Sequence, residues 1–202
     1  MSVAAAGGTV RVPRILVADD GRQATSPPPG LDAAILLRNT DLATLIDVAT
    51  SAPSPPAVDL DSVRGLGGDD AAVDFLRRRL GIEIVLTRRP ATAAGFAALG
   101  GLALLSVLAF DSTGLARSLG AHPRTERVGT VVSPGLVLTH MTASELALLP
   151  PPVVAYGLLG TPGDVAACLE RGDAVVVNAQ LAADVARVTP AVSRGPVHAH
   201  GE

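Results

Sequence analysis

The sequence predicts one α/β domain built as a small TIM-type (β/α)8 barrel. Eight short apolar segments recur along the 202 residues, beginning at positions 14, 33, 57, 83, 103, 128, 153 and 174, so that neighbouring starts lie 19 to 26 residues apart. One strand, one helix and two short loops need about 20–25 residues, which leaves room for a single helix between successive strands. Most segments are continuously apolar, which is typical of parallel strands covered on both faces. An open doubly wound parallel sheet with fewer strands is the alternative.

The eight segments define the predicted strands and the limits of the domain. The strands are expected at 14–18, 33–37, 57–60, 83–87, 103–109, 128–133, 153–157 and 174–177. The predicted domain extends over residues 13–188, with flexible tails at 1–12 and 189–202. Because no low-complexity linker interrupts it, one domain is expected.

Helical patterns lie between most of these strands. The 40–52 segment places apolar residues on one stripe, with Thr40 as its N-cap. A second amphipathic helix is expected over 69–80, and a third over 161–172, where Thr161 and Pro162 mark the start. The first crossover, 20–30, is rich in proline and cannot form a regular helix, and 51–56 is a similar connector.

The composition excludes several functions. All 16 basic residues are Arg, so Schiff-base catalysis and a lysine-bearing P-loop are excluded. Aromatic residues make up only 2%, so the core must be aliphatic. The net charge of −3 argues against broad nucleic-acid binding, although a local arginine patch could still serve. The single Cys168 and the lack of a signal or membrane-spanning segment predict a cytoplasmic protein.

Function in a barrel of this type resides at the carboxyl ends of the strands. The residues at those positions are Asp19, Arg38, Asp59, Arg88, Asp111, Ser133, Gly157 and Asn178. Carboxylates together with a guanidinium could hold a small polyol phosphate, with arginine on the phosphate. The predicted ligand-binding residues are therefore Asp59, Arg88, Asp111, Gly157 and Asn178. The competing interpretation is that such residues only cap the next helix, as Asp111 would do for 112–120.

Other motifs favour structural explanations. The glycine-rich 65–68 loop could approach a phosphate, but Asp69 and Asp70 follow it and would repel an anion, so a turn is expected. The run Arg77-Arg78-Arg79 is typical of a solvated helix face. The four histidines lack metal-ligand spacing, so neither a metal nor a cofactor is predicted.

An ordered series of short segments resembles the glycerol-3-phosphate-responsive antiterminator family. The segment from Val58-Asp59-Leu60 through Gly65-Leu66 to 69–76 is the most specific part of the match. The resemblance continues through Thr87-Arg88 and Phe110-Asp111-Ser112, and then through Pro134-Gly135, 155–159 and 161–165. It covers roughly residues 57–180, with a weaker match over 14–52. It implies a TIM-barrel regulator that binds glycerol 3-phosphate and acts on the leader transcript of glycerol-utilisation genes.

The sequence departs from the family pattern at the end of the seventh and eighth strands. Tyr156 replaces the first glycine of a Gly-Gly pair, and 178–180 replaces a Thr-Ser-Asn strand end. A tyrosine side chain can block the approach of a phosphate to the backbone. The fold is therefore expected to follow the family more closely than the ligand site does.

Three functions remain open at this point. The first is a non-enzymatic, ligand-responsive antiterminator, whose RNA-binding residues would be Arg64, Arg89, Arg117, Arg124 and Arg127, together with Arg88, if they converge in space. The second is a small barrel enzyme acting on a phosphorylated metabolite, with Asp59 and Asp111 as acid and base and a divalent metal ion. The third is a degenerate sensor or scaffold that has lost ligand binding. A homo-oligomer is compatible with the sequence.

Overall fold

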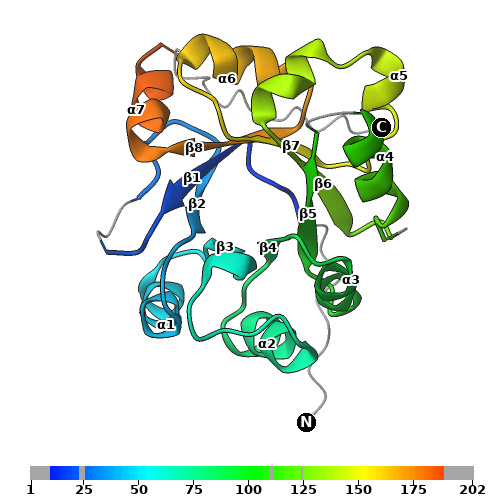
Figure 1. Ribbon diagram of the computed structural model, residues 1–202. Coiled ribbons are helices and arrows are strands. Elements are labelled where there is room, and N and C mark those ends of the chain that lie inside the picture. The colour runs from blue at the N-terminus through cyan, green and yellow to red at the C-terminus, as the bar shows by residue number, and fades with distance from the viewer. Residues whose placement is uncertain (1–9, 23–25, 110–111, 124, 189–202) are drawn as a thin grey trace, which may run out of the picture.

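The computed structural model is a closed barrel of eight parallel strands, and it describes residues 10–22, 26–109, 112–123 and 125–188. Each strand pairs with its neighbours in the sequence, and β1 pairs with β8 to close the barrel (Figure 1). The strands are β1 (Ile15–Asp19), β2 (Ala33–Leu37), β3 (Ala57–Asp59), β4 (Ile84–Thr87), β5 (Leu102–Leu108), β6 (Val128–Ser133), β7 (Val153–Tyr156) and β8 (Ala174–Asn178). The predicted (β/α)8 barrel is thus confirmed, and closure excludes the open sheet.

Helices surround the barrel and run back between successive strands (Figure 1). They are α1 (Leu42–Ser51), α2 (Asp70–Asp74), α3 (Pro90–Ala98), α4 (Ser112–Gly120), α5 (Ala143–Leu146), α6 (Pro162–Leu169) and α7 (Ala179–Val188). Short 3₁₀ turns occupy Leu60–Ser62 and Gly135–His140. No helix within the described ranges is both long and apolar enough to cross a membrane.

The core forms in separate layers because successive strand residues point to opposite faces. Leu16, Leu36 and Leu104 point into the barrel and are fully buried there. The outward residues pack under the helices in two clusters, one below α1 to α3 and one below α6 and α7. Val12 is also buried in the interior cluster, and Val10 packs against it.

Two predicted helices differ in detail from the structure. Asp41, not Thr40, is the N-cap of α1, because its carboxylate accepts a hydrogen bond of 2.9 Å from the Thr44 backbone N–H. Thr40 is instead buried, and its carbonyl accepts from the Arg64 N–H at 2.9 Å. The predicted 69–80 helix is α2 followed by a π-helical turn, Phe75–Arg79, which widens the end of the helix.

The first crossover lacks a helix over residues 20–22 and 26–32, as its prolines predict. The outer face of β2 is therefore left with a groove of about 380 Å³. Ile35 of β2, Val48 of α1 and the proline-rich connector 53–56 line this groove. The groove runs along the side of the barrel wall, from Ala33 at the start of β2 to Asp19 and Gly21 at the carboxyl end of β1.

Candidate functional site at the barrel mouth

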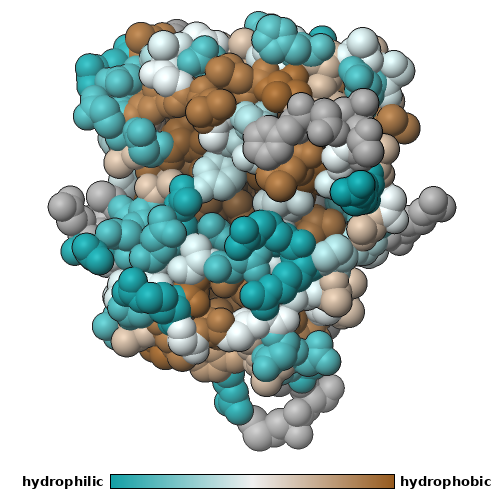
Figure 2. Space-filling model, in the orientation of Figure 1, coloured by the Kyte–Doolittle hydropathy of each residue, from teal (hydrophilic) through white to brown (hydrophobic). Residues whose placement is uncertain are grey.

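The carboxyl ends of the strands surround a polar hollow of about 390 Å³. Parallel strands bring all their carboxyl ends to one edge, so residues far apart in sequence meet there. Figure 2 shows hydrophilic side chains in a band across the middle of the view, over β2, β3 and β4. The hollow is lined by Arg38, Asn39, Asp59, Asp61, Ser62, Leu86, Thr87, Arg88, Ser106, Leu108, Ser133 and Tyr156.

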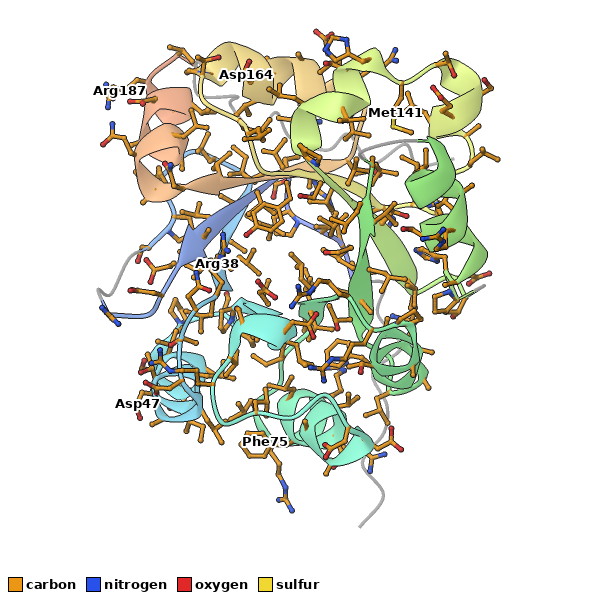
Figure 3. All side chains as sticks on the ribbon, viewed as in Figure 1. Arg38, Asp47, Phe75, Met141, Asp164 and Arg187 are labelled. Atoms are coloured by element: carbon orange, nitrogen blue, oxygen red, sulfur yellow. The ribbon has the colours of Figure 1, made fainter. Side chains whose placement is uncertain are left out.

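Arg38 and Tyr156 form a cation–π pair across the mouth. Arg38 directly follows β2, and its guanidinium carbon lies 5.2 Å from the centre of the ring of Tyr156, the last residue of β7. The Arg38 backbone N–H donates to the Asp19 carbonyl at 2.8 Å, which continues the β1–β2 pairing. Figure 3 labels Arg38 beside the end of β2, near the middle of the barrel.

Asp59 ends β3 beside this pair. Burial raises the pKa of the Asp59 carboxyl above its ordinary value, while the Arg38 guanidinium and the Ser62 hydroxyl act in the opposite direction. Burial also raises the pKa of the Tyr156 phenol, against the effect of Arg38. These three side chains therefore form one electrostatically connected group.

Asp61 organises the arginines at the β3–β4 side of the mouth. Its side chain is only 5% exposed and accepts hydrogen bonds from the Arg88 backbone N–H at 2.5 Å and the Thr87 hydroxyl at 3.2 Å. Arg88 Nε lies 3.5 Å from Asp61 Oδ2, and Arg89 Nε lies 3.2 Å from Asp61 Oδ1, the latter without hydrogen-bond alignment. Both guanidinium groups thus share one buried carboxylate, which leaves an excess of positive charge at this side of the mouth.

The two helix N-termini after β7 and β8 are capped by the chain itself. At α6, one Asp164 carboxylate oxygen accepts from the backbone N–H groups of Gly160 at 3.0 Å and Thr161 at 2.9 Å. At α7, Asn178 Oδ1 accepts from the Leu181 N–H at 2.8 Å. These backbone donors, which hold phosphate in many barrels, therefore already have acceptors.

The predicted ligand-binding residues occupy different positions around the mouth. Asp59 and Arg88 both line the hollow. Gly157 has a positive φ of 85° after β7, and its carbonyl accepts from the Gly135 N–H at 3.0 Å. Asn178 acts as the helix cap described above and does not line the hollow. Asp111 lies outside the described residues.

The structure brings together only some of the arginines predicted to bind RNA. Arg64 follows the 3₁₀ turn after β3 and pairs with Asp41 at 3.5 Å, on the same end of the barrel as Arg88 and Arg89. Arg117 lies in the last turn of α4, which runs away from the mouth. Arg127 precedes β6 at the opposite end and donates to the Gly100 carbonyl at 3.1 Å. Arg124 lies outside the described residues.

Arg38 and Asp61 were not among the predicted ligand-binding residues. The strand-end rule placed Arg38 among the eight candidate positions, but no local signal distinguished it from the others. Asp61 lies in a 3₁₀ turn two residues beyond β3, and no local pattern signals that it would be buried. The glycine-rich loop predicted to be a turn is covered, because Arg89 packs so closely on Gly68 that a Cβ there would overlap the guanidinium.

The fold and its polar mouth place this protein in the class of single-domain (β/α)8 barrels. Among solved structures, it is similar to the glycerol uptake operon antiterminator regulatory protein of Listeria monocytogenes, at 20% identity and a TM-score of 0.65 over 80% of this chain and 90% of that one. A glycerol uptake operon antiterminator-related protein from Thermotoga maritima is 20% identical with a TM-score of 0.65, over 84% of this chain and 97% of that one. A structure described as native KDPGal is 14% identical, with a TM-score of 0.54 over 89% and 95% of the two chains.

The chain belongs to the glycerol-3-phosphate responsive antiterminator family, whose model matches residues 31–181. This confirms the family resemblance seen in the ordered segments. The solved structures share the fold at low identity. No curated protein sequence matches the chain.

Proposed function

We propose that the protein is a ligand-responsive transcription antiterminator. It senses glycerol 3-phosphate or a similar small phosphorylated ligand, and it acts in the cytoplasm on the leader mRNA of glycerol-utilisation genes. Family membership supports the regulatory class. The observation that carries the proposal is the polar hollow at the barrel mouth, where arginines and carboxylates surround a volume of about 390 Å³.

The chemistry of the mouth suits a small phosphorylated polyol. Guanidinium groups bind phosphate through charge-assisted hydrogen bonds, and Arg38 and Arg88 both line the hollow. The hydroxyl groups of a polyol can donate to a carboxylate, and they can exchange hydrogen bonds with serine hydroxyls. Asp59, Ser106 and Ser133 supply these groups in the hollow. The volume lies at the lower end of the range for ligand pockets, which favours a molecule of a few carbons.

A second candidate is an enzyme acting on the same ligand class, with Asp59 as acid or base. It is favoured by one observation, the raised pKa of Asp59 beside Tyr156, because such shifts suit proton transfer. The regulator remains the proposal because the family is one of antiterminators. Recovery of glycerol 3-phosphate unchanged after prolonged incubation, followed by ³¹P NMR, supports the regulator, and its conversion supports the enzyme.

Thermal unfolding tests ligand sensing directly. Glycerol 3-phosphate at about one hundred times its dissociation constant stabilises a protein by about 2.7 kcal/mol, which raises the midpoint of a domain of this size by about 5–10 °C. Glycerol and inorganic phosphate at equal concentration are the controls, and they are expected to give smaller shifts. Equal midpoints with and without glycerol 3-phosphate would contradict the proposed ligand and favour a degenerate sensor.

A further inference from the structure

Arg38 differs from the other arginines of the barrel mouth in its partners. Arg64 pairs with Asp41, and Arg88 and Arg89 both pair with Asp61. Within the described ranges, Arg38 forms no ion pair with a carboxylate, and its Nε is buried without a hydrogen-bond acceptor. A buried donor without an acceptor costs free energy, so such a group in a native protein calls for an explanation.

The Tyr156 ring contacts the Arg38 guanidinium without using its hydrogen-bond donors. The pair at 5.2 Å is a contact with the face of the ring. A cation–π contact leaves the guanidinium edges available, and those edges match the two oxygens of a phosphate. Asp59 lies close enough to interact electrostatically with both members of the pair, so an oxygen-rich ligand would meet a donor and an acceptor side by side.

The usual phosphate cradle of a barrel is unfavourable in this chain. The Asp164 carboxylate accepts hydrogen bonds from the backbone N–H groups of Gly160 and Thr161, just before α6. Its negative charge would also repel an anion there. Leu158, which follows Gly157, has a positive φ of 59° and an exposed side chain, where glycine would have left the backbone open. A phosphate would therefore be bound more favourably on the β2 side of the mouth than after β7 and β8.

We propose that Arg38, held against the Tyr156 ring, is the oxyanion-binding residue of this barrel, with Asp59 accepting a hydroxyl of the same ligand. The ligand class is a small phosphomonoester that carries at least one free hydroxyl. The proposal rests on the proposed function in treating the mouth as the sensory site. It goes further in assigning the anion to a position at the end of β2 instead of the loops after β7 and β8.

The only tyrosine of the chain gives a direct measurement of this site. The protein has one Tyr and no Trp, so tyrosine fluorescence and the tyrosine band of the near-ultraviolet circular dichroism spectrum report on Tyr156, apart from the phenylalanine bands of the three Phe. The experiment titrates the full chain with glycerol 3-phosphate, inorganic phosphate and sulfate while following both signals, and it also records the thermal midpoint. The variants are Arg38→Gln and Arg38→Lys, with Arg78→Gln as a control that removes the same charge at an exposed position outside the hollow.

The expected result is a loss of anion affinity of at least about tenfold in Arg38→Gln, which corresponds to about 1.4 kcal/mol. Arg38→Lys keeps the charge but loses the planar fork, so it should bind with intermediate affinity. Arg78→Gln should stay within about threefold of the original protein, since neither Arg78 nor its partner Asp74 lines the hollow. Asp164→Asn should also leave anion affinity unchanged, whereas a phosphate at the start of α6 would bind more tightly in that variant.

The outcomes separate this inference from the proposed function. If inorganic phosphate or sulfate binds and depends on Arg38, but glycerol 3-phosphate binds no better, the oxyanion site stands and the proposed ligand fails. If glycerol 3-phosphate binds equally well to Arg38→Gln and to the original protein, the proposed function stands and the assignment to Arg38 is overturned. Failure of all three anions to bind the original protein also overturns the assignment. A thermal midpoint equal to that of the original protein in Arg38→Gln and Arg38→Lys shows that both variants are folded, so that a loss of anion binding is then due to the missing guanidinium.

Discussion

Asp59 illustrates how a single residue at the mouth is held at a cost to stability. Its carboxyl is partly withdrawn from water at the end of β3, and burial raises its pKa. A carboxyl whose folded-state pKa exceeds its unfolded value near 4 destabilises the fold once it ionises. Stability from this group is therefore lost as pH rises through the folded-state pKa. Strain of this kind is common where a side chain is positioned for a ligand rather than for packing.

Replacing Asp59 by Asn is expected to raise the unfolding midpoint at pH 7, because the amide carries no charge to desolvate. The gain should shrink as pH falls below about 4, where the original carboxyl is protonated in both states. Thermal unfolding at a series of pH values, monitored by far-ultraviolet circular dichroism, measures the difference. A variant that is less stable than the original protein at pH 7 would show that the contact with Arg38 outweighs burial.

The capping motif at the start of helix α6 can be recognised in the sequence, and it also determines whether the N-terminus of this helix can bind an anion. Thr161 and Pro162 predicted its start, and the structure confirms that Thr161 is the N-cap with Pro162 at the first helical position. Asp164 completes a reciprocal capping box with Thr161. Hydrogen bonds from the Gly160 and Thr161 N–H groups lower the pKa of the Asp164 carboxyl. The same carboxylate that stabilises the helix also closes its N-terminus to phosphate.

The capping carboxylate is expected to give a pH dependence opposite in sign to that of Asp59. Because the folded-state pKa of Asp164 is lowered, its contribution to stability is present above the unfolded value near 4 and is lost as pH falls through the folded-state value. Asp164→Asn should therefore lower the unfolding midpoint at pH 7, with the difference disappearing in acid. Asp47→Asn, an exposed position on α1, is the control. An equal loss at pH 7 and in acid would point to a packing effect instead.

Across the whole molecule, the arginines are distributed between the two ends of the barrel. Arg64, Arg88 and Arg89 follow strands at the mouth, whereas Arg127 precedes β6 at the opposite end. A net charge of −3 argues against a broad positive surface for RNA. If the protein binds leader mRNA as proposed, the arginines of the mouth end are the better candidates, which would place RNA close to the ligand.

Arg64→Gln is expected to weaken binding of the leader transcript and to reduce the slope of log affinity against log salt by about one unit. Arg78→Gln is a matched control, because Arg78 also forms an exposed ion pair, with Asp74. The Arg78 side chain is 66% exposed and the Arg64 side chain 69%. Filter binding or fluorescence anisotropy over a salt series gives both quantities. Equal effects of the two substitutions would indicate that contact with RNA is nonspecific, and no effect of either would remove Arg64 from the interface.

The sequence by itself determined the strands, most helices and the fold class of this protein. These features depend on local patterns, because a strand buried on both faces must be continuously apolar and a helix on a barrel must be apolar along one stripe. Only the tertiary structure decided that β1 pairs with β8, and that Arg38, Asp59 and Tyr156 meet although they follow different strands. It also decided which arginines have a carboxylate partner, because the pairing of Arg88 and Arg89 with Asp61 depends on burial and on distances across the fold. Those quantities arise only when segments far apart in the chain are packed together.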